Sequence, residues 1–143
     1  MSYRPMTGDE WMAFLLAEAR PAILATTRSD GRPHAAPVWI DVDQGAVWFN
    51  TGADTVKGRN LARTGVASIC VQDDRPPFSF VVVEGTVELI DDLELVRAWA
   101  TRLGGRHMGA DRADAYGARN GVPGELLVKL SPTKVISAID VAD

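Results

Sequence analysis

Between residues 22 and 90 the chain is a series of short apolar runs rich in β-branched residues and separated by turn signals. The runs cover residues 22–27, 33–43, 46–51, 66–72 and 78–90, and Asp30-Gly31 marks a hairpin turn between the first two. A last strand is expected at 125–139, interrupted at Ser131-Pro132. Six or so antiparallel strands whose faces alternate predict a small closed β-barrel, because closure removes exposed sheet edges.

Three helical patterns accompany these strands. The first runs from Thr7 to about residue 19, with Glu10 three residues after a capping threonine. A short basic helix is expected at 55–63, and an amphipathic helix at 91–103 that ends at Gly104-Gly105. The fold class is therefore predicted to be mainly β, a barrel with peripheral helices.

Residues 104–124 contain six glycines and give the weakest structural pattern in the chain. Glycine loses more conformational freedom on ordering than any other residue. We therefore expect a mobile segment here, with at most one helical turn near 111–118. His107 lies in this segment, either as a proton donor on a lid or as an ordinary loop residue.

Composition narrows the class of protein. The 143 residues suit one domain spanning 1–143, and 46% hydrophobic residues suit a packed core. Nineteen acidic residues against 15 Lys plus Arg give a net charge of −4, which argues against a nucleic-acid partner. The single cysteine, Cys70, is expected to be a small core residue and excludes an intrachain disulfide. Apolar runs of strand length and a polar N-terminus predict a cytoplasmic protein without a membrane partner.

Motifs of conventional catalysis are missing from the sequence. It contains no Gly-x-Ser-x-Gly, His-Glu-x-x-His, Walker or dinucleotide-binding motif, and two histidines are few for a metal site. No catalytic residue or metal ligand is assigned. If the chain is an enzyme, a cofactor is expected to supply the chemistry.

The basic helix at 55–63 is the most informative local pattern. A lysine at position 57 falls in the first turn, although cations stabilise the opposite end of a helix. Free backbone N–H groups, the Thr55 hydroxyl, Lys57 and Arg59 together would form a phosphate site. The alternative is a solvated basic face.

Aromatic residues on two strands also have two interpretations, as core residues or as part of a binding site. Trp39, in Pro37-Val38-Trp39, is either a core residue or a rim residue that covers a flat ring. The same two interpretations apply to Phe78 and Phe80, between which Ser79 could place a hydroxyl near a ligand.

Taken together, four segments resemble a known family. They are Leu24–His34, Pro37-Val38-Trp39, Lys57-Gly58-Arg59-Asn60-Leu61 and Val83-Glu84-Gly85-Thr86-Val87. In order and spacing they are similar to the split β-barrel flavin/deazaflavin oxidoreductases related to pyridoxamine 5'-phosphate oxidase, above all the actinobacterial branch that uses coenzyme F420. The resemblance implies the FMN-binding split-barrel fold and a homodimer with two cofactor sites at its interface.

The resemblance also implies roles for particular residues. Lys57 would hold the cofactor phosphate, together with Thr55, Arg59 and Asn60. The ring would be lined by Pro37, Val38 and Trp39, the ribityl-like chain would contact Asn50 and Thr51, and the partner subunit would contribute Phe78, Ser79 and Phe80. Some relatives carry a second basic residue where this chain has Thr55, and the sparseness of arginines favours the deazaflavin over FMN.

The function implied is that of an F420-dependent reductase, which passes a hydride from the deazaflavin to an electron-poor small molecule. Two alternatives stay open: an FMN-binding oxidoreductase of the pyridoxamine 5'-phosphate oxidase type, and a non-catalytic carrier of F420, flavin or haem. F420 has an anionic oligoglutamate tail, for which the candidate partners are Arg102, Arg106, Arg112 and Arg119. Neither the substrate nor a proton donor can be named from the sequence.

Overall fold

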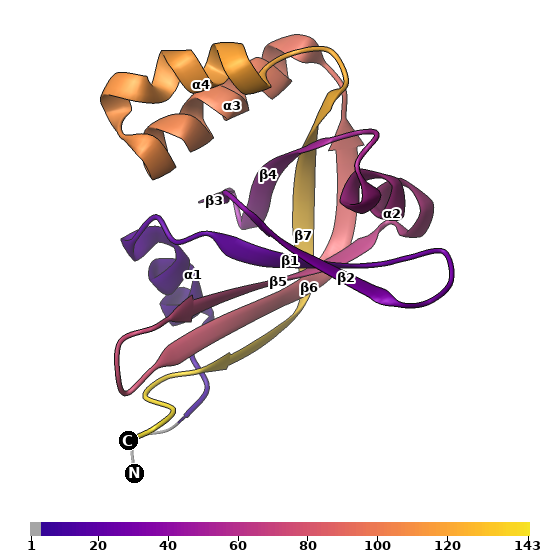
Figure 1. Ribbon diagram of the computed structural model, residues 1–143. Coiled ribbons are helices and arrows are strands. Elements are labelled where there is room, and N and C mark those ends of the chain that lie inside the picture. The colour runs from indigo at the N-terminus through magenta and orange to yellow at the C-terminus, as the bar shows by residue number, and fades with distance from the viewer. Residues whose placement is uncertain (1–3) are drawn as a thin grey trace.

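A computed structural model describes residues 4–143, which form one antiparallel sheet of seven strands and four α-helices (Figure 1). The strands are β1 (Ala22–Thr27), β2 (Pro33–Val38), β3 (Asp41–Asp43), β4 (Ala46–Gly52), β5 (Val66–Asp73), β6 (Ser79–Ile90) and β7 (Glu125–Ala138). The helices are α1 (Gly8–Ala17), α2 (Val56–Thr64), α3 (Leu93–Met108) and α4 (Ala113–Asn120), with a 3-10 turn at Ala110–Arg112. Residues 1–3, part of the N-terminus used to predict the location, lie outside the described residues.

The sheet has the strand order β2-β1-β5-β6-β7-β4-β3 and curls into a half-barrel (Figure 1). Its two edge strands, β2 and β3, are consecutive in the chain and are joined only by Trp39 and Ile40. The prediction of one strand over 33–43 is therefore wrong. Val38 is the last residue that pairs with β1, and Asp41 is the first that pairs with β4, so the chain must leave one sheet edge before it reaches the other.

The core lies inside the curl. Leu24, Phe49, Ile69 and Val83 are fully buried, and β1 alternates between buried and exposed residues as its sequence predicts. Helix α1 adds Leu15 to this core. Its predicted capping box is present, although the helix ends at residue 17 rather than 19.

The glycine-rich segment is helical, which corrects two predictions. Helix α3 continues through Gly104 to Met108, and α4 is a full helix beside it rather than one turn (Figure 1). A Cβ on Gly104 would lie 2.3 Å from the Cβ of Tyr116, and one on Gly117 would lie 2.0 Å from Thr101 Oγ1. These glycines therefore allow two helices to approach closely.

Strand β7 is continuous across Ser131-Pro132, where the sequence predicts an interruption. A register shift against β6 between Glu84 and Gly85 absorbs the irregularity, and the Thr133 hydroxyl donates to the Glu84 carbonyl. A Cβ on Gly85 would lie 2.0 Å from the Ser131 carbonyl oxygen, so this position requires glycine. Among residues 4–143, no helix is both long and apolar enough to cross a membrane.

Candidate functional site

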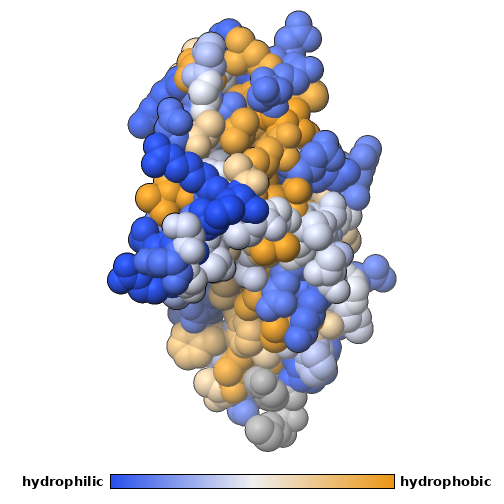
Figure 2. Space-filling view, turned by 90° about the vertical axis from the view of Figure 1, so that its right-hand side faces the viewer, coloured by the Kyte–Doolittle hydropathy of each residue, from blue (hydrophilic) through white to orange (hydrophobic). Residues whose placement is uncertain are grey.

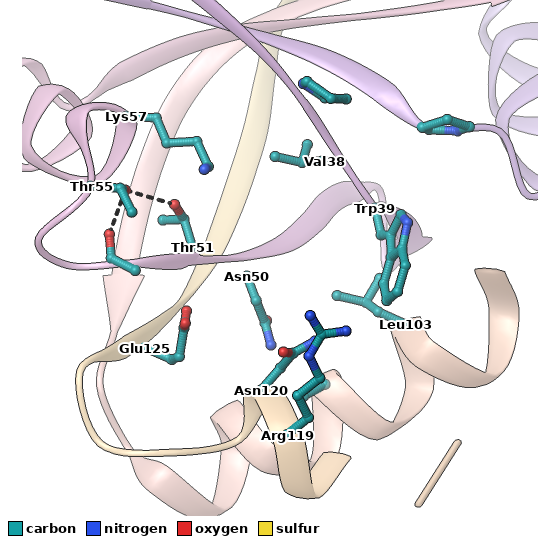
Figure 3. Close-up of a pocket in the computed structure, with 14 residues that line it drawn as sticks. Val38, Trp39, Asn50, Thr51, Thr55, Lys57, Leu103, Arg119, Asn120 and Glu125 are labelled. Atoms are coloured by element: carbon teal, nitrogen blue, oxygen red, sulfur yellow. Dashed lines mark hydrogen bonds between the residues drawn. The ribbon is translucent and has the colours of Figure 1, made fainter. Parts of the chain in front are cut away.

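A cavity of about 550 Å³ lies between β2, β4, the start of α2 and the α3–α4 pair (Figure 3). Its size is typical of small-molecule sites. Seven of the twelve predicted site residues line it: Pro37, Val38, Trp39, Asn50, Thr51, Thr55 and Lys57. Arg119, expected only as a partner for the cofactor tail, also lines it, and sequence reasoning missed the other lining residues, which are Pro21, Gly52, Ala100, Leu103, Asn120 and Glu125.

The polar end of the cavity is built where β4 passes into α2. Thr55 Oγ1 accepts a hydrogen bond from the Gly58 N–H at 3.1 Å and donates to the Gly52 carbonyl at 2.7 Å. The hydroxyl oxygen of the buried Thr51 lies 3.3 Å from Thr55 Oγ1. Because a Cβ on Gly58 would lie 2.1 Å from the Gly52 oxygen, glycine is needed for this close junction. Within the chain, the Thr55 hydroxyl therefore serves as a helix cap.

Lys57 supplies the positive charge at this end. It is the second residue of α2, is half-buried, and points into the cavity (Figure 3). Within residues 4–143 it forms no salt bridge, and the first turn of α2 contains no acidic residue. The first N–H groups of a helix have no partner within it, and they favour anions. The helix start and Lys57 together supply the groups that a site for an anion requires.

Glu125, the first residue of β7, faces the same end of the cavity (Figure 3). Burial raises the pKa of its carboxyl group, while the charge of Lys57 acts in the opposite direction. A carboxylate here repels a bound anion and stabilises Lys57 when none is bound. Glu125 follows an irregular segment, and no pattern in the sequence around it predicts that it faces the cavity.

Asn50 lies between the two ends of the cavity (Figure 3). Its side-chain nitrogen makes a long contact of 3.5 Å with the Val96 carbonyl oxygen. Its side-chain oxygen is buried and has no hydrogen-bond partner within the described part of the chain. Buried acceptors are rarely left unpaired, so this atom indicates a donor supplied by a ligand or water.

The opposite end is aromatic. The Trp39 ring stacks on His107, with centroids 5.6 Å apart and planes at 6°, and meets Tyr116 edge-on at 5.2 Å. The His107 Nε2 atom lies 2.9 Å from the Ile40 carbonyl oxygen and 3.2 Å from the Ile40 nitrogen. Burial lowers the pKa of His107, which favours the neutral ring. The residue expected in a loop thus lies on α3 and holds Trp39 at the cavity wall.

Comparison with known proteins places the chain in a family. Residues 8–137 match the family model described as pyridoxamine 5'-phosphate oxidase. The chain belongs to this family. Proteins of this family are generally flavin-binding oxidoreductases of split-barrel fold. A pyridoxine/pyridoxamine 5'-phosphate oxidase from Gloeothece citriformis is 34% identical over 93 residues, which cover 61% of this chain and 43% of the relative. The match thus spans less than half the length of that curated relative.

Two solved structures share the fold. A conserved hypothetical protein from Mycobacterium tuberculosis matches 94% of this chain and 86% of its own, with 24% identity and a TM-score of 0.80. A protein named F420 reductase matches 86% of this chain and 94% of its own, with 26% identity and a TM-score of 0.68. The expected split-barrel fold is confirmed.

The cavity has features that fit the flavin-type cofactors of the pyridoxamine 5'-phosphate oxidase family. The positive end at Lys57 suits a phosphate, the Trp39 wall suits a flat ring, and the unpaired Asn50 oxygen suits a hydroxyl donor between them. Arg119, whose guanidinium lies 5.6 Å from the Tyr116 ring centroid, adds a second cation near the aromatic end.

The other three arginines considered for the cofactor tail are absent from the cavity lining. Arg102 pairs with Asp41 and Asp43, both at 2.8 Å. Arg106 donates to the backbone carbonyls of Leu15 and Glu18, which joins α3 to α1. Arg112 packs over the Tyr116 ring. These side chains support the fold around the aromatic end.

Five predicted site residues also lie outside the cavity lining. Asn60 is buried and donates to Thr26, while Arg59 borders a separate hollow. At the start of β6, Ser79 Oγ accepts from the Asp140 N–H. The remaining two are its neighbours Phe78 and Phe80. A role for residues 78–80 in the site of a partner subunit stays a prediction.

Cys70 is half-buried on β5, and burial raises the pKa of its thiol. A raised pKa keeps the thiol protonated and unreactive. The expectation of a small core residue is wrong, because Cys70 lies on the outer face of β5 between the buried Ile69 and Val71.

Proposed function

We propose that the chain is an F420-dependent reductase acting on a small electron-poor molecule. The observation that carries the proposal is a single cavity with an anion site at Lys57 and an aromatic wall at Trp39. Of the Lys and Arg residues described, only Lys57 and Arg119 line it. So few cations near the phosphate favour a cofactor whose phosphate is a singly charged diester over FMN, whose phosphate monoester carries about two charges. The similarity to a protein named F420 reductase supports the same choice.

The reduced deazaflavin, when bound, supplies a hydride from its C5 carbon. The protein's own residues bind and orient the cofactor. Lys57 and the first N–H groups of α2 hold the phosphate, and Asn50 accepts a hydrogen bond from the chain between phosphate and ring. Val38 and Trp39 line one face of the ring, while Leu103 and Ala100 of α3 keep water from that side.

The test is cofactor preference. Purified protein is titrated separately with F420 and with FMN, and binding is followed by absorbance and fluorescence. We expect tighter binding of F420, followed by oxidation of F420H2 when an enone is added. Tighter binding of FMN would overturn the proposal in favour of a flavin oxidoreductase. Binding of F420 without turnover across enones, quinones and tetrapyrroles would favour a carrier.

We further propose that the chain works as a homodimer. Ile23, Cys70, Val82 and Ile136 face one another in register across β1, β5, β6 and β7, on the outer side of the sheet. Ile23 is 46% exposed and Ile136 40%, so this apolar row lacks a cover within residues 4–143. Sedimentation should show a dimer that Ile23→Asp converts to a monomer. A monomeric wild-type protein at micromolar concentration would contradict the dimer.

A further inference from the structure

A second hollow, of about 540 Å³, lies between the β1–β2 hairpin and the outer side of α2. We call it the arginine pocket, because Arg28, Arg32, Arg59 and Arg63 line it and Asp30 is its only acidic residue. Figure 2, which views the side on which α2 and the hairpin lie in Figure 1, shows strongly hydrophilic side chains gathered at mid-height. The arginine pocket shares no lining residue with the cofactor cavity.

The charge of this pocket is not balanced within the described chain. Several arginines elsewhere have acidic partners: Arg4 pairs with Glu10, Arg75 with Asp73, and Arg102 with Asp41. In the arginine pocket only Arg32 has one, at Asp30. The other three arginines form no salt bridge within residues 4–143, although the whole chain has more acidic than basic residues. Positive charges that line one hollow repel one another unless an anion is bound between them.

Two of the arginines are held in place. Arg32 donates through Nε and Nη2 to Asp30, at 2.9 and 2.7 Å. Arg63 donates to the Thr27 carbonyl oxygen and, at 3.0 Å, to the side-chain oxygen of the buried Asn60. The Asn60 nitrogen in turn donates to Thr26 at 3.0 Å. This chain of bonds gives Asn60 a structural role and fixes part of the pocket before any ligand arrives.

The remaining two arginines have no side-chain hydrogen bond within residues 4–143, whereas Arg32 and Arg63 each use only some of their donors. Arg28 lies at the base of the hairpin, where its N–H donates to the Arg32 carbonyl, and its exposed side chain has no hydrogen bond within residues 4–143. Arg59 is exposed on α2, a helix whose nine residues include three cations and no acid. Cations near the start of a helix are unfavourable unless a negative group offsets them.

We propose that the arginine pocket binds a small anion that carries two or more phosphate or carboxylate groups. Four guanidinium groups can hold several anionic oxygens by paired hydrogen bonds, and the volume suits a molecule larger than a single inorganic ion. Such a ligand has two sources, the carboxylate tail of a cofactor seated in the neighbouring cavity or a separate metabolite. Only the first source rests on the proposed function.

The experiment titrates the full chain at low salt with inorganic pyrophosphate and with triglutamate, and follows binding by calorimetry. We expect a binding event, separate from any at Lys57, whose affinity falls at least tenfold in the double variant Arg28→Gln/Arg32→Gln and falls as salt is raised. Arg97→Gln/Arg112→Gln, which removes two other arginines remote from the arginine pocket, should bind like the wild type. Lys57→Ala should also retain this binding, because Lys57 lies in the other cavity.

Three outcomes decide the matter. Loss of binding in the hairpin double variant alone supports the proposal. Loss in Lys57→Ala alone, or equal loss in the Arg97/Arg112 control, places the anion elsewhere and overturns it. No binding of either probe at millimolar concentration also overturns it. The proposed function is tested independently, because F420 without its glutamate tail should still bind the hairpin double variant.

The two sources are then separated with F420 preparations that carry and lack the tail. If the tail occupies the arginine pocket, removing it weakens binding to the wild type but not to Arg28→Gln/Arg32→Gln. If the two preparations bind the wild type equally while pyrophosphate still binds, the occupant is a separate anion. Either result supports the arginine pocket as an anion site.

Discussion

The two ends of the cofactor cavity are built in different ways. Apart from Glu125, the polar end comes from one continuous stretch, residues 50–57, in which the last residues of β4 lead into the first turn of α2. The aromatic end joins Trp39 to His107 on α3 and Tyr116 on α4, more than 60 residues along the chain. The first is fixed by a helix cap and local hydrogen bonds, the second by helix packing against the sheet.

This difference has a consequence for mutation. Replacing Lys57 at the polar end should alter the binding of an anionic cofactor with little effect on folding, because its side chain forms no salt bridge within residues 4–143. A change at the aromatic end should alter stability first, because its side chains also join α3 and α4 to the sheet.

The largest effect on binding is expected from Lys57→Ala. Loss of a charged hydrogen bond to phosphate costs about 1.5–3 kcal/mol, or roughly ten- to a hundred-fold in affinity. The thermal midpoint of the cofactor-free protein should hardly change. Lys134→Ala, which removes an exposed charge on β7, is the matched control. Cofactor titration with unchanged affinity in Lys57→Ala would remove the phosphate site from the polar end.

The largest effect on stability is expected from Gly104→Ala. The added Cβ would overlap the Cβ of Tyr116, so α4 must shift, at a cost of about 1–3 kcal/mol. Gly8→Ala is the control, since no atom lies within 4 Å of its added Cβ. Urea denaturation measures the free energy of unfolding of both variants. Equal stability of the two variants would show that the α3–α4 contact is looser than the structure has it.

A smaller, pH-dependent effect is expected at His107. Burial lowers its folded-state pKa below the ordinary value of 6.5, so the unfolded chain binds the proton more readily. Stability should therefore be highest above pH 6.5 and decline as the pH falls through the folded-state pKa. Thermal midpoints measured from pH 8 to 5 should decline less in His107→Gln. Parallel pH profiles would mean that the ring is as easily protonated in the folded protein.

The smallest effect is expected from Glu125→Gln at the polar end. Its pKa is raised, so the folded chain binds the proton more tightly, and the ionised carboxylate lowers stability above that pKa. Removing the charge should raise the affinity for an anionic cofactor about two- to five-fold at pH 7, as for a partly screened pair. The advantage over wild type should shrink as the pH falls and Glu125 is protonated. A weaker cofactor complex would instead indicate that the carboxylate accepts a hydrogen bond from the ligand.

Most strands could be predicted because their signals are local. Strands β1, β5 and β6 begin and end within one residue of their predicted bounds, since burial alternates with a period of two. The helix stop at Gly104 was wrong because glycine near the end of an apolar pattern has two meanings. It ends helices, and it also lets helices approach, and only the position of Tyr116 decides between them.

The sequence by itself determined most of the strand series, the start of α2 and the lysine in its first turn, because each depends on residues within a few positions of one another. Only the tertiary structure decided that Trp39 leaves the sheet between β2 and β3, that Glu125 faces Lys57, and that the β1–β2 hairpin meets α2 around the arginine pocket. Such contacts join residues far apart in the chain, and they depend on how far the sheet curls and how closely the helices pack, which no local pattern encodes.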